Sequence, residues 1–309
     1  MALQLNGEND MNNNFRSGFI AIVGEPNVGK STLLNTLMLK KIAIVSNKPQ
    51  TTRNRIQGIL ITDDYQIIFI DSPGIHKSTN ELGKSLNRVA MQSTKGVEGI
   101  LWLVNSYEEI SLTHQYIYKS LQEREVPIFL GLTKIDLITS EQLEQKIKLW
   151  NERFNVQEII GISCLKNINI SFLLNKLMMT LPLGPQYFPK NMFQDQQEDF
   201  FVKEIIREKI LLLTHQEVPH GVAILIEEFK KERTKKIIRV IATIVVERDS
   251  QKGILIGNGG KMIKNIGSQA RIELEEIFAT QFYLELFVKV IKKWRDSPNI
   301  LAKLGYGKK

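Results

Sequence analysis

Gly24-Glu25-Pro26-Asn27-Val28-Gly29-Lys30-Ser31 is the stretch of sequence that decides the fold. It fits G-x-x-x-x-G-K-[ST], follows the apolar run Phe19–Val23 and opens a helical pattern at Lys30. This strand–loop–helix order is the setting in which the pattern marks a phosphate-binding loop. Glycines let backbone N–H groups surround phosphate oxygens, and the helix start adds partial positive charge. We expect Lys30 to reach the β- and γ-phosphates and the Ser31 hydroxyl to ligate Mg²⁺.

Short apolar runs alternate with helical periodicities as far as residue 181. Strands are expected at Phe19–Val23, Ile56–Ile61, Gln66–Ile70, Ile100–Val104, Ile128–Leu132 and Glu158–Ile162. Helices are expected from Lys30 and near Gly83–Lys95, Leu112–Arg124, Glu141–Phe154 and Ile168–Leu181. Strands that alternate with helices predict an α/β fold, with a mostly parallel sheet covered on both faces. Such sheets bind ligands at the carboxyl ends of their strands.

A proline-rich segment, Leu181–Pro189, interrupts this pattern and is expected to be a linker. After it the pattern predicts a helix, two strands, two helices around Gly257 and a last strand. Their ranges are Asp199–Leu213, Gly221–Phe229, Lys236–Glu247 and, for the last strand, Gln281–Ile291. We expect a disordered, Asn-rich tail at 1–17, a first domain at 18–181, a linker at 182–195 and a smaller α+β domain at 196–309.

Composition fits a chain of 309 residues in two globular domains. The single cysteine, Cys164, excludes an intramolecular disulfide and fits a reducing cytoplasm. No apolar run reaches the length of a membrane span. Residues 182–309 hold 22 Lys and Arg against 16 Asp and Glu, so most of the net charge of +8 lies there. This excess indicates a polyanion or an anionic membrane surface as partner, the alternative being a solvated basic surface.

Thr133-Lys134-Ile135-Asp136 ends an apolar strand behind the phosphate loop and predicts a choice of base. A carboxylate at Asp136 can accept hydrogen bonds from guanine N1–H and N2–H₂. Adenine offers neither donor, so an unpaired acceptor would penalise ATP. Ser163-Cys164-Leu165-Lys166 follows the last strand of this domain and could support the base from its other side.

These motifs, together with Thr51-Thr52-Arg53 and Asp71-Ser72-Pro73-Gly74, resemble those of the translation-factor-type, Ras-like small GTPases. The resemblance implies that Thr52 is the switch I threonine and that Asp71 holds Mg²⁺ through water. It implies that Gly74 senses the γ-phosphate in switch II. Thr133 departs from the family, which usually has Asn there, so base affinity is expected to be lower. The expected GTP-binding residues are Gly24, Glu25, Pro26, Asn27, Val28, Gly29, Lys30, Ser31, Thr32, Asp71, Ser72, Pro73, Gly74, Thr133, Lys134, Asp136, Ser163, Cys164 and Leu165, with Ser31, Thr52 and Asp71 at the metal.

No catalytic residue is assigned with certainty. Ras-like enzymes place a water-orienting Gln after the glycine of switch II, whereas Ile75 stands here and implies slow intrinsic hydrolysis. We expect His76 and the other histidines to be structural or exposed. Asn27 and the Thr-Thr-Arg loop resemble potassium-activated GTPases, which makes K⁺ a candidate cofactor beside GTP/GDP and Mg²⁺. The alternative is that Asn27 only braces the phosphate loop.

The second half carries the G-x-x-G pattern Gly257-Asn258-Gly259-Gly260 between two helical stretches. A tight glycine loop lets a nucleic-acid backbone approach, and a KH module clamps about four nucleotides of single strand in this way. The element order α-β-β-α-α-β resembles type II KH domains; the alternative is a plain helix–helix turn. The candidate RNA-binding residues are Ile256, Gly257, Asn258, Gly259, Gly260, Lys261 and Lys264.

A GTPase followed by a KH domain resembles the Era family of bacterial GTPases, over about residues 17 to 306. The linker sequence, Glu217–His220, the glycine loop and residues 285–306 carry the likeness. The resemblance implies a monomeric assembly factor of the 30S subunit that binds the 3′ end of 16S rRNA. It also implies a cytoplasmic protein with peripheral association at the inner membrane. The alternatives are a protein that binds nucleotide without turnover, and a Ras-like GTPase of tRNA modification or large-subunit assembly.

Overall fold

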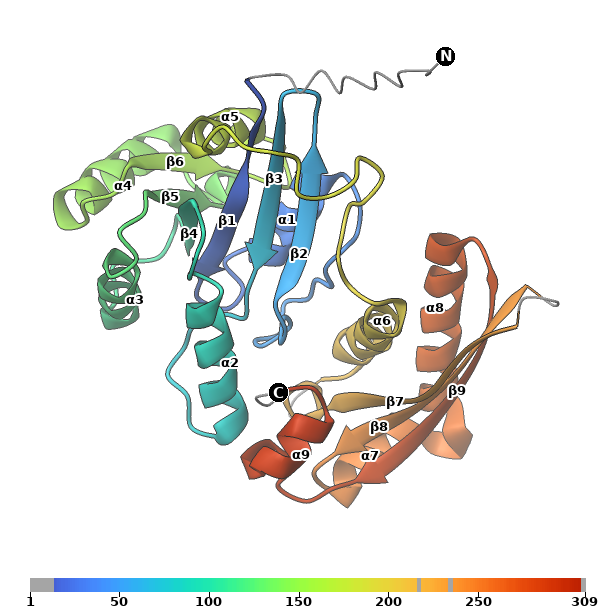
Figure 1. Cartoon of the computed structure of the whole chain (residues 1–309). Coiled ribbons are helices and arrows are strands. Elements are labelled where there is room, and N and C mark those ends of the chain that lie inside the picture. Colours follow the sequence, from blue (N-terminus) through green and yellow to red (C-terminus); the bar gives the residue numbers. More distant parts are fainter. Residues whose placement is uncertain (1–13, 216–217, 233–235, 307–309) are drawn as a thin grey trace, which may run out of the picture.

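The chain folds around two separate β-sheets (Figure 1). The computed structural model describes residues 14–215, 218–232 and 236–306. The first sheet has the order β2-β3-β1-β4-β5-β6, with β2 antiparallel to β3 and the other neighbours parallel. Its strands are β1 (Arg16–Gly24), β2 (Ile56–Ile61), β3 (Tyr65–Asp71), β4 (Gly99–Asn105), β5 (Ile128–Thr133) and β6 (Glu158–Ile162). The expectation of a mostly parallel sheet is confirmed.

Helices cover both faces of this sheet, because its central strands are apolar on both sides. One face packs against α1 (Lys30–Met38) and α5 (Ile170–Thr180). The other face packs against α2 (Glu81–Gln92), α3 (Leu112–Gln122) and α4 (Ser140–Arg153). The predicted helices are therefore present, and α2 begins two residues before its predicted start because Asn80 caps it.

The second sheet is smaller and has the order β7-β8-β9. Its strands are β7 (Ala223–Glu232), β8 (Ile237–Val246) and β9 (Gln281–Val290), and β8 pairs antiparallel with β7 but parallel with β9. Three helices pack on one face of it: α6 (Glu198–Leu213), α7 (Asp249–Ile256) and α8 (Lys261–Phe278). The predicted order α-β-β-α-α-β is confirmed. So is the alternation in β9, since its even-numbered residues from Phe282 to Val290 pack into this core.

A short segment after β9, which the periodicity did not predict, closes the fold. It contains the turn η4 (Trp294–Asp296) and the helix α9 (Pro298–Lys303), too short to show an amphipathic pattern. Trp294 and Tyr306 pack with Leu82 and Leu86 of α2 in a common apolar cluster. Figure 1 shows the C-terminal end of the described chain between the two sheets, with α9 near α2. The last residues of the second half therefore touch the first.

The expected disordered tail at 1–17 is wrong for its last residues, and 1–13 lie outside the described residues. β1 already begins at Arg16, because Arg16 and Ser17 pair with Tyr65 and Gln66 of β3. Ser17 also donates from its backbone to the carbonyl of Pro182 at 3.1 Å. Backbone pairing on both sides thus extends the strand beyond the apolar run that predicted it.

The connection between the two halves runs along the first sheet. The buried side chain of Gln66 accepts from the backbone N–H of Tyr187 at 2.7 Å and donates to the carbonyl of Phe188 at 2.8 Å. Ile59 on the edge strand β2 donates to the carbonyl of Phe193 at 3.0 Å. The segment between the two halves, residues 182–195, is thus hydrogen-bonded to β3 and β2; it is called the strap below.

No helix within the described ranges is long and apolar enough to cross a bilayer.

Candidate functional site

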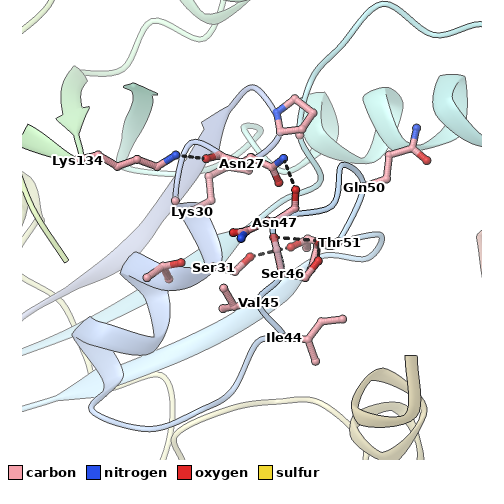
Figure 2. Close-up of a pocket in the computed structure, with 15 residues that line it drawn as sticks. Asn27, Lys30, Ser31, Ile44, Val45, Ser46, Asn47, Gln50, Thr51 and Lys134 are labelled. Atoms are coloured by element: carbon pink, nitrogen blue, oxygen red, sulfur yellow. Dashed lines mark hydrogen bonds between the residues drawn. The ribbon is translucent and has the colours of Figure 1, made fainter. Parts of the chain in front are cut away.

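The phosphate loop lies between β1 and α1, where the sequence predicts it. Gly24 and Gly29 have φ angles of 148° and 98°, which favour glycine, and a Cβ on Gly24 would collide with the carbonyl oxygen of Leu103. The loop lines a cavity of about 340 Å³. Figure 2 shows the side chains around it. The lining residues are Pro26, Asn27, Gly29, Lys30, Ser31, Thr32, Ile44, Val45, Ser46, Asn47, Gln50, Thr51, Thr52, Gly74 and Lys134.

Lys30 folds back on its own loop. Its Nζ donates to the carbonyls of Glu25 at 2.8 Å and Gly24 at 3.2 Å. Burial lowers the pKa of the Lys30 ammonium to about 8, although Asp71 and Glu25 raise it. Within the described part of the chain, the hydrogen-bond acceptors of this buried ammonium are these two neutral carbonyls, so an anionic group would be a stronger partner. The phosphates of a nucleotide fit that need.

The three predicted metal residues converge beside Lys30. The Ser31 hydroxyl donates to Asp71 Oδ2 at 2.6 Å, and Thr52 Oγ1 lies 2.7 Å from Ser31 Oγ. Among the described residues Asp71 Oδ1 has no hydrogen-bond partner although it is buried. Burial raises the pKa of the Asp71 carboxyl to about 6, against the opposing effect of Lys30. Two hydroxyls and a carboxylate with an unpaired oxygen form the hard oxygen donor set that suits Mg²⁺.

The Asp71–Gly74 segment packs directly against the phosphate loop. The Ser72 hydroxyl donates to the carbonyl of Ile22 at 2.9 Å, which fixes the segment on β1. A Cβ on Gly74 would lie 2.6 Å from the backbone nitrogen of Pro26, so only glycine fits there. Ile75 is 1% exposed and belongs to the apolar core of the first sheet. Its side chain is therefore committed to packing and cannot orient a water molecule.

Thr133 and Lys134 hold the phosphate loop from the side of β5. The Thr133 hydroxyl donates to the carbonyl of Val28 at 2.8 Å, with the carbonyl of Val104 at 3.1 Å. Lys134 Nζ donates to the carbonyl of Asn27 at 2.8 Å, a bond that Figure 2 marks with a dashed line. Thr133 is thus a link between the predicted guanine motif and the phosphate loop, and its short side chain makes that link.

The residues expected around the base contact one another, and they are not among the residues that line the phosphate-loop cavity. The Ser163 hydroxyl donates to Asp136 Oδ1 at 2.5 Å and accepts from the backbone N–H of Lys166 at 3.1 Å. Leu165 is 82% exposed, so its side chain is accessible to a base. Burial raises the pKa of the Cys164 thiol to about 11, so it stays protonated near neutral pH.

A loop over the cavity supplies residues that the motif analysis missed. Ile44, Val45, Ser46, Asn47 and Gln50 line the cavity from the long connection between α1 and β2. They carry no recognisable pattern. The available signal was the length of that connection, residues 39–55, because structureless loops of this length in compact domains are usually functional.

Asn27 reaches this loop. It has a φ angle of 64°, and its Nδ2 donates to the backbone carbonyl of Asn47 at 3.1 Å (Figure 2). The bond closes the cavity on one side. Gln50 connects the same loop to the residues that follow Gly74, since its Nε2 lies 3.0 Å from Nε2 of His76. His76 is partly buried, and its Nδ1 also lies 3.0 Å from the carbonyl of Gly74.

Glu25, Glu108 and His114 form a second cluster of potential metal ligands. Nδ1 of His114 accepts from the backbone N–H of Ser111 at 3.0 Å, so in the neutral ring Nε2 carries the hydrogen. That nitrogen lies 2.8 Å from Glu25 Oε2, and the contact lowers the pKa of Glu25. A protonated Nε2 has no lone pair for a metal. His114 thus connects Glu25 of the phosphate loop to the first turn of α3.

The predicted RNA-binding residues lie together at the junction of α7 and α8. Gly257, Gly259 and Gly260 have φ angles of 70°, 59° and 78°, which explains the need for glycine in this loop. A Cβ on Gly259 or Gly260 would meet nothing within 4 Å, so the loop is open on its outer side. Lys261 and Lys264 are exposed on the first turn of α8, and Ile256 lies half-buried before the loop.

A groove that the sequence analysis missed adjoins this loop. It has a volume of about 310 Å³ and runs between α8 and β9. Its lining residues are Ile263, Lys264, Gly267, Ser268, Arg271, Leu284, Glu285 and Leu286. Lys264, one of the candidate RNA-binding residues, also lines the groove. Arg271, about two turns after Lys264 on α8, carries no motif of its own, so only the helical packing of α8 on β9 reveals it.

Two family models match the chain, one in each half. The family described as 50S ribosome-binding GTPase matches residues 19–134, and the KH domain family matches residues 217–295. The first match covers the phosphate loop, both switch motifs and the start of the guanine motif. The second covers the smaller sheet and the glycine loop. The predicted fold, a Ras-like GTPase domain followed by a KH domain, is confirmed.

Curated relatives and solved structures match nearly the whole chain. GTPase Era of Clostridium kluyveri is 47% identical over 291 residues, which cover 94% of this chain and 99% of the relative. GTPase Era of Thermoanaerobacter sp. strain X514 is 45% identical, with 94% and 96% covered. A structure of an Aquifex aeolicus Era variant bound to GDP·AlF4⁻ matches with a TM-score of 0.91 and 36% identity, covering 95% of this chain and 100% of that one.

A structure of Era in complex with MgGDPNP and nucleotides 1506–1542 of 16S ribosomal RNA matches with a TM-score of 0.92 and 36% identity. It covers 95% of this chain and all of the matched chain. The relatives and this chain therefore share one domain order from end to end. With full-length identities of 45 to 47%, the chain belongs to the Era family of GTPases.

Proposed function

We propose that this chain is a GTP-controlled RNA-binding protein that acts on the 3′ end of small-subunit ribosomal RNA. As a member of a GTPase family it hydrolyses GTP to GDP and phosphate. The observation that carries the proposal is the pairing, in one chain, of a phosphate-loop cavity with an open glycine loop on a KH domain. The related Era structure with MgGDPNP and 16S rRNA nucleotides supports this assignment of the two sites.

Nucleotide recognition is assigned to the motifs of the first half. The phosphate loop and Lys30 would hold the phosphates, and Ser31, Thr52 and Asp71 would hold Mg²⁺. Asp136, supported by Ser163, would select guanine. The convergence of Ser31, Thr52 and Asp71 within hydrogen-bond distance supports the metal assignment. Mg²⁺ supplies positive charge that offsets charge developing on the transferred phosphoryl group.

RNA recognition is assigned to the glycine loop and the groove beside it. An exposed loop of glycines lets a sugar–phosphate backbone approach, and Lys261 and Lys264 add positive charge. The groove between α8 and β9 offers apolar walls and the polar groups of Ser268, Arg271 and Glu285 to unstacked bases. The excess of six positive charges in residues 182–309 supports a polyanionic partner.

A direct experiment tests the main proposal. A labelled RNA with the sequence of the 16S 3′ end is titrated with the full-length protein bound to GDPNP or to GDP, with Mg²⁺. We expect tight binding and an RNA affinity that differs between the two nucleotides. Since coupling between two ligands is reciprocal, the RNA should change the ratio of GDPNP to GDP affinity by the same factor. An RNA of the same length and scrambled sequence is the control. Equal binding of both RNAs would reject the sequence assignment.

We further propose that K⁺ assists hydrolysis. Asn27 Nδ2 donates to the carbonyl of Asn47 at 3.1 Å over the phosphate loop, so the amide group, which also carries Oδ1, and a loop carbonyl are neighbours. A monovalent cation held by such oxygens would add positive charge near the β–γ bridge, where Ile75 offers no polar group. The alternative remains that Asn27 only braces the loop.

The resemblance to the family also leads us to propose a monomer that joins 30S subunit assembly in the cytoplasm and associates peripherally with the membrane. The domain limits 18–181, 182–195 and 196–309 belong to the same proposal, with the first now extended to Arg16. Co-sedimentation with 30S subunits and with anionic lipid vesicles separates the two locations. Binding to neither would reject both.

A further inference from the structure

Two buried arginines hold the backbone on either side of Thr52, the predicted switch I threonine. Arg207 comes from α6, in the second half of the chain, and is 0% exposed. Its Nη2 donates to the backbone carbonyl of Thr51, and its Nη1 lies 3.5 Å from the carbonyl of Gln50. Glu204, one turn earlier on α6, forms an ion pair with Arg207 and orients the guanidinium.

Arg53, directly after Thr52, makes the reverse connection: its side chain reaches from the loop into the second half of the chain. Its side chain is 1% exposed and leaves the first domain to enter the second. Its Nη1 donates to the carbonyl of Val222 at 2.6 Å, next to β7. The guanidinium lies over the rings of Trp294 and Tyr306, at 5.9 Å and 5.6 Å from their centroids. A guanidinium stacked on aromatic rings in a buried site is held firmly.

The consequence falls on the residue between them. The carbonyl before Thr52 and the side chain after it are both fixed by the second half of the chain, so its hydroxyl is held 2.7 Å from Ser31 Oγ. A loop that is already ordered loses less conformational entropy when its ligand binds. The cavity side of switch I is thus shaped by residues that lie outside the GTPase domain.

We propose that Arg53 and Arg207 are positioning residues for GTP. They hold Thr52 where it meets the metal and the γ-phosphate, so the KH half completes the GTPase centre. This inference rests on the proposed assignment of Thr52 as the switch I metal ligand. Neither arginine lines the cavity, and each acts through the backbone of residues 50–53.

The same anchor reaches the second switch. The carbonyl of Tyr306 accepts from the hydroxyl of Ser85 on α2 at 2.6 Å, and Leu82 and Leu86 pack with Trp294. α2 follows the Asp71–Gly74 motif in the chain. The segment from Trp294 to Tyr306 therefore contacts elements that follow both predicted switches. A conformational change at either switch would therefore reach the end of the KH half through direct contacts.

Nucleotide affinities of full-length variants test the proposal. In Arg53→Met, we expect the affinity for GDPNP with Mg²⁺ to fall about tenfold while the affinity for GDP stays within about twofold. Only the triphosphate state uses Thr52, whereas a merely destabilised fold would weaken both ligands. kcat should fall as well. Arg295→Met is the matched control, since Arg295 pairs with Glu247 in the same half at 2.9 Å.

Arg207→Lys is the second variant, chosen because a lysine keeps a cation beside buried Glu204. A single ammonium cannot bond both the Glu204 carboxylate and the Thr51 carbonyl as the guanidinium does. GDPNP affinity should therefore fall in Arg207→Lys, but less than in Arg53→Met. Thermal unfolding of each variant verifies the fold. Restoration of most GDPNP affinity in Arg53→Lys relative to Arg53→Met would further support a positioning role.

Thr52→Ala in the same assay separates two kinds of failure. If Thr52→Ala leaves the GDPNP-to-GDP affinity ratio unchanged, the assignment of the metal site is wrong. If Thr52→Ala lowers that ratio but Arg53→Met and Arg207→Lys do not, the positioning role is overturned while the site assignment stands. An equal loss of GDP and GDPNP affinity in the arginine variants would also overturn it.

Discussion

The hydroxyl of Thr133, at the end of β5, donates a hydrogen bond to the backbone carbonyl of Val28 at 2.8 Å. A residue of the predicted guanine motif thereby fixes the phosphate loop. Both carbonyls near this hydroxyl, those of Val28 and Val104, lie in the interior, where a lost donor costs more than at the surface. Thr133 therefore fixes the backbone of the phosphate loop at Val28, although its side chain is shorter than the Asn that is usual at this position.

Replacing Thr133 by Val keeps the shape of the side chain but removes the donor. We expect affinity for GTP and GDP to fall together by about fivefold, which corresponds to one buried hydrogen bond of about 1 kcal/mol. Thr133→Ser, which keeps the hydroxyl, is the control and should bind nearly as the parent does. Titration with fluorescent nucleotides measures both. A loss confined to GTP would contradict the argument, because the phosphate loop that contains Val28 is proposed to hold phosphates common to both ligands.

Asp136 is expected to select the base. In Asp136→Asn the amide can donate to the C2 carbonyl of xanthine, where guanine presents an amine. We expect GTP affinity to fall by on the order of 3 kcal/mol and XTP affinity to rise. Ser163 donates to the same side chain at 2.5 Å, so Ser163→Ala should weaken guanine binding less than Asp136→Asn does. Unchanged GTP affinity in Asp136→Asn would remove Asp136 from the site.

Periodicity and motif spacing predict most of the strands and helices and the phosphate loop, for a physical reason. A strand buried on both faces must be apolar throughout, as Leu101, Trp102 and Leu103 in β4 are, and a phosphate loop needs its glycines at fixed positions. The pattern of β9 reads equally clearly, since Phe282 to Val290 alternate toward one core. Such features follow from a few neighbouring residues, which is why the sequence alone reveals them.

Features made by distant residues could not be predicted in this way. Asn47 lines the cavity and accepts from Asn27 through its backbone carbonyl, a contact that does not depend on the identity of its side chain. Arg53 looks like an exposed loop residue until Val222 and Tyr306 are seen to enclose it. The strand residues Arg16 and Ser17 likewise owe their conformation to partners in β3 and the strap. Tertiary contacts decide each case.

The thiol of Cys164 offers a test by pH. Its pKa is raised to about 11 by burial, from an ordinary value of 9.0, so at pH 8 it holds about a hundredfold less thiolate than an ordinary cysteine. We expect slow alkylation by iodoacetamide at pH 8 that accelerates up to about pH 11. Because the unfolded thiol loses its proton first, stability should fall as pH rises from about 9 to 11. Cys164→Ser is the control, and rapid labelling at pH 8 would contradict the assigned burial.

RNA binding should depend on the charge of the glycine loop. Asn258→Asp with Gly259→Asp would place two carboxylates where phosphates are expected, and should abolish binding of the 16S 3′ end while GTP binding survives. Asn258 is exposed and a Cβ at Gly259 meets nothing within 4 Å, so neither carboxylate collides with the protein. The φ of 59° at residue 259 strains residues other than glycine, although Asp adopts this conformation more readily than most. Binding by the parent protein should weaken with salt at a slope of about −0.7 per neutralised phosphate.

A matched variant makes this RNA experiment specific. Gly96, in the first domain, has a φ of 66° and the same open surroundings, so Gly96→Asp adds one charge at an equivalent backbone position. Compared with Gly259→Asp alone, it should leave RNA affinity unchanged. If the two single variants lost affinity equally, the effect would reflect net charge. If the double variant bound the 3′ end normally, the glycine loop would not be the RNA site.

Potassium dependence is the sharpest test of how hydrolysis proceeds with Ile75 after Gly74. If Asn27 and the loop carbonyls hold a cation near the phosphates, steady-state GTP turnover should be faster in KCl than in NaCl at equal ionic strength. Na⁺ is smaller and fits a K⁺-sized ring of oxygens poorly. Asn27→Ala should remove the difference between the two salts while Mg²⁺-dependent binding of GDP persists.

Asn27→Gly separates the loss of the side-chain amide from the backbone strain that Asn27→Ala introduces. Residue 27 has a φ of 64°, a strained conformation for Ala that glycine adopts freely, and both variants lack the amide that bonds the Asn47 carbonyl at 3.1 Å. Loss of K⁺ stimulation in both variants assigns the effect to the amide. Loss in Asn27→Ala with retention in Asn27→Gly assigns it to backbone strain and rejects the ligand role. Equal turnover of the parent protein in KCl and NaCl would reject the potassium site outright and leave RNA or the 30S subunit as the source of activation.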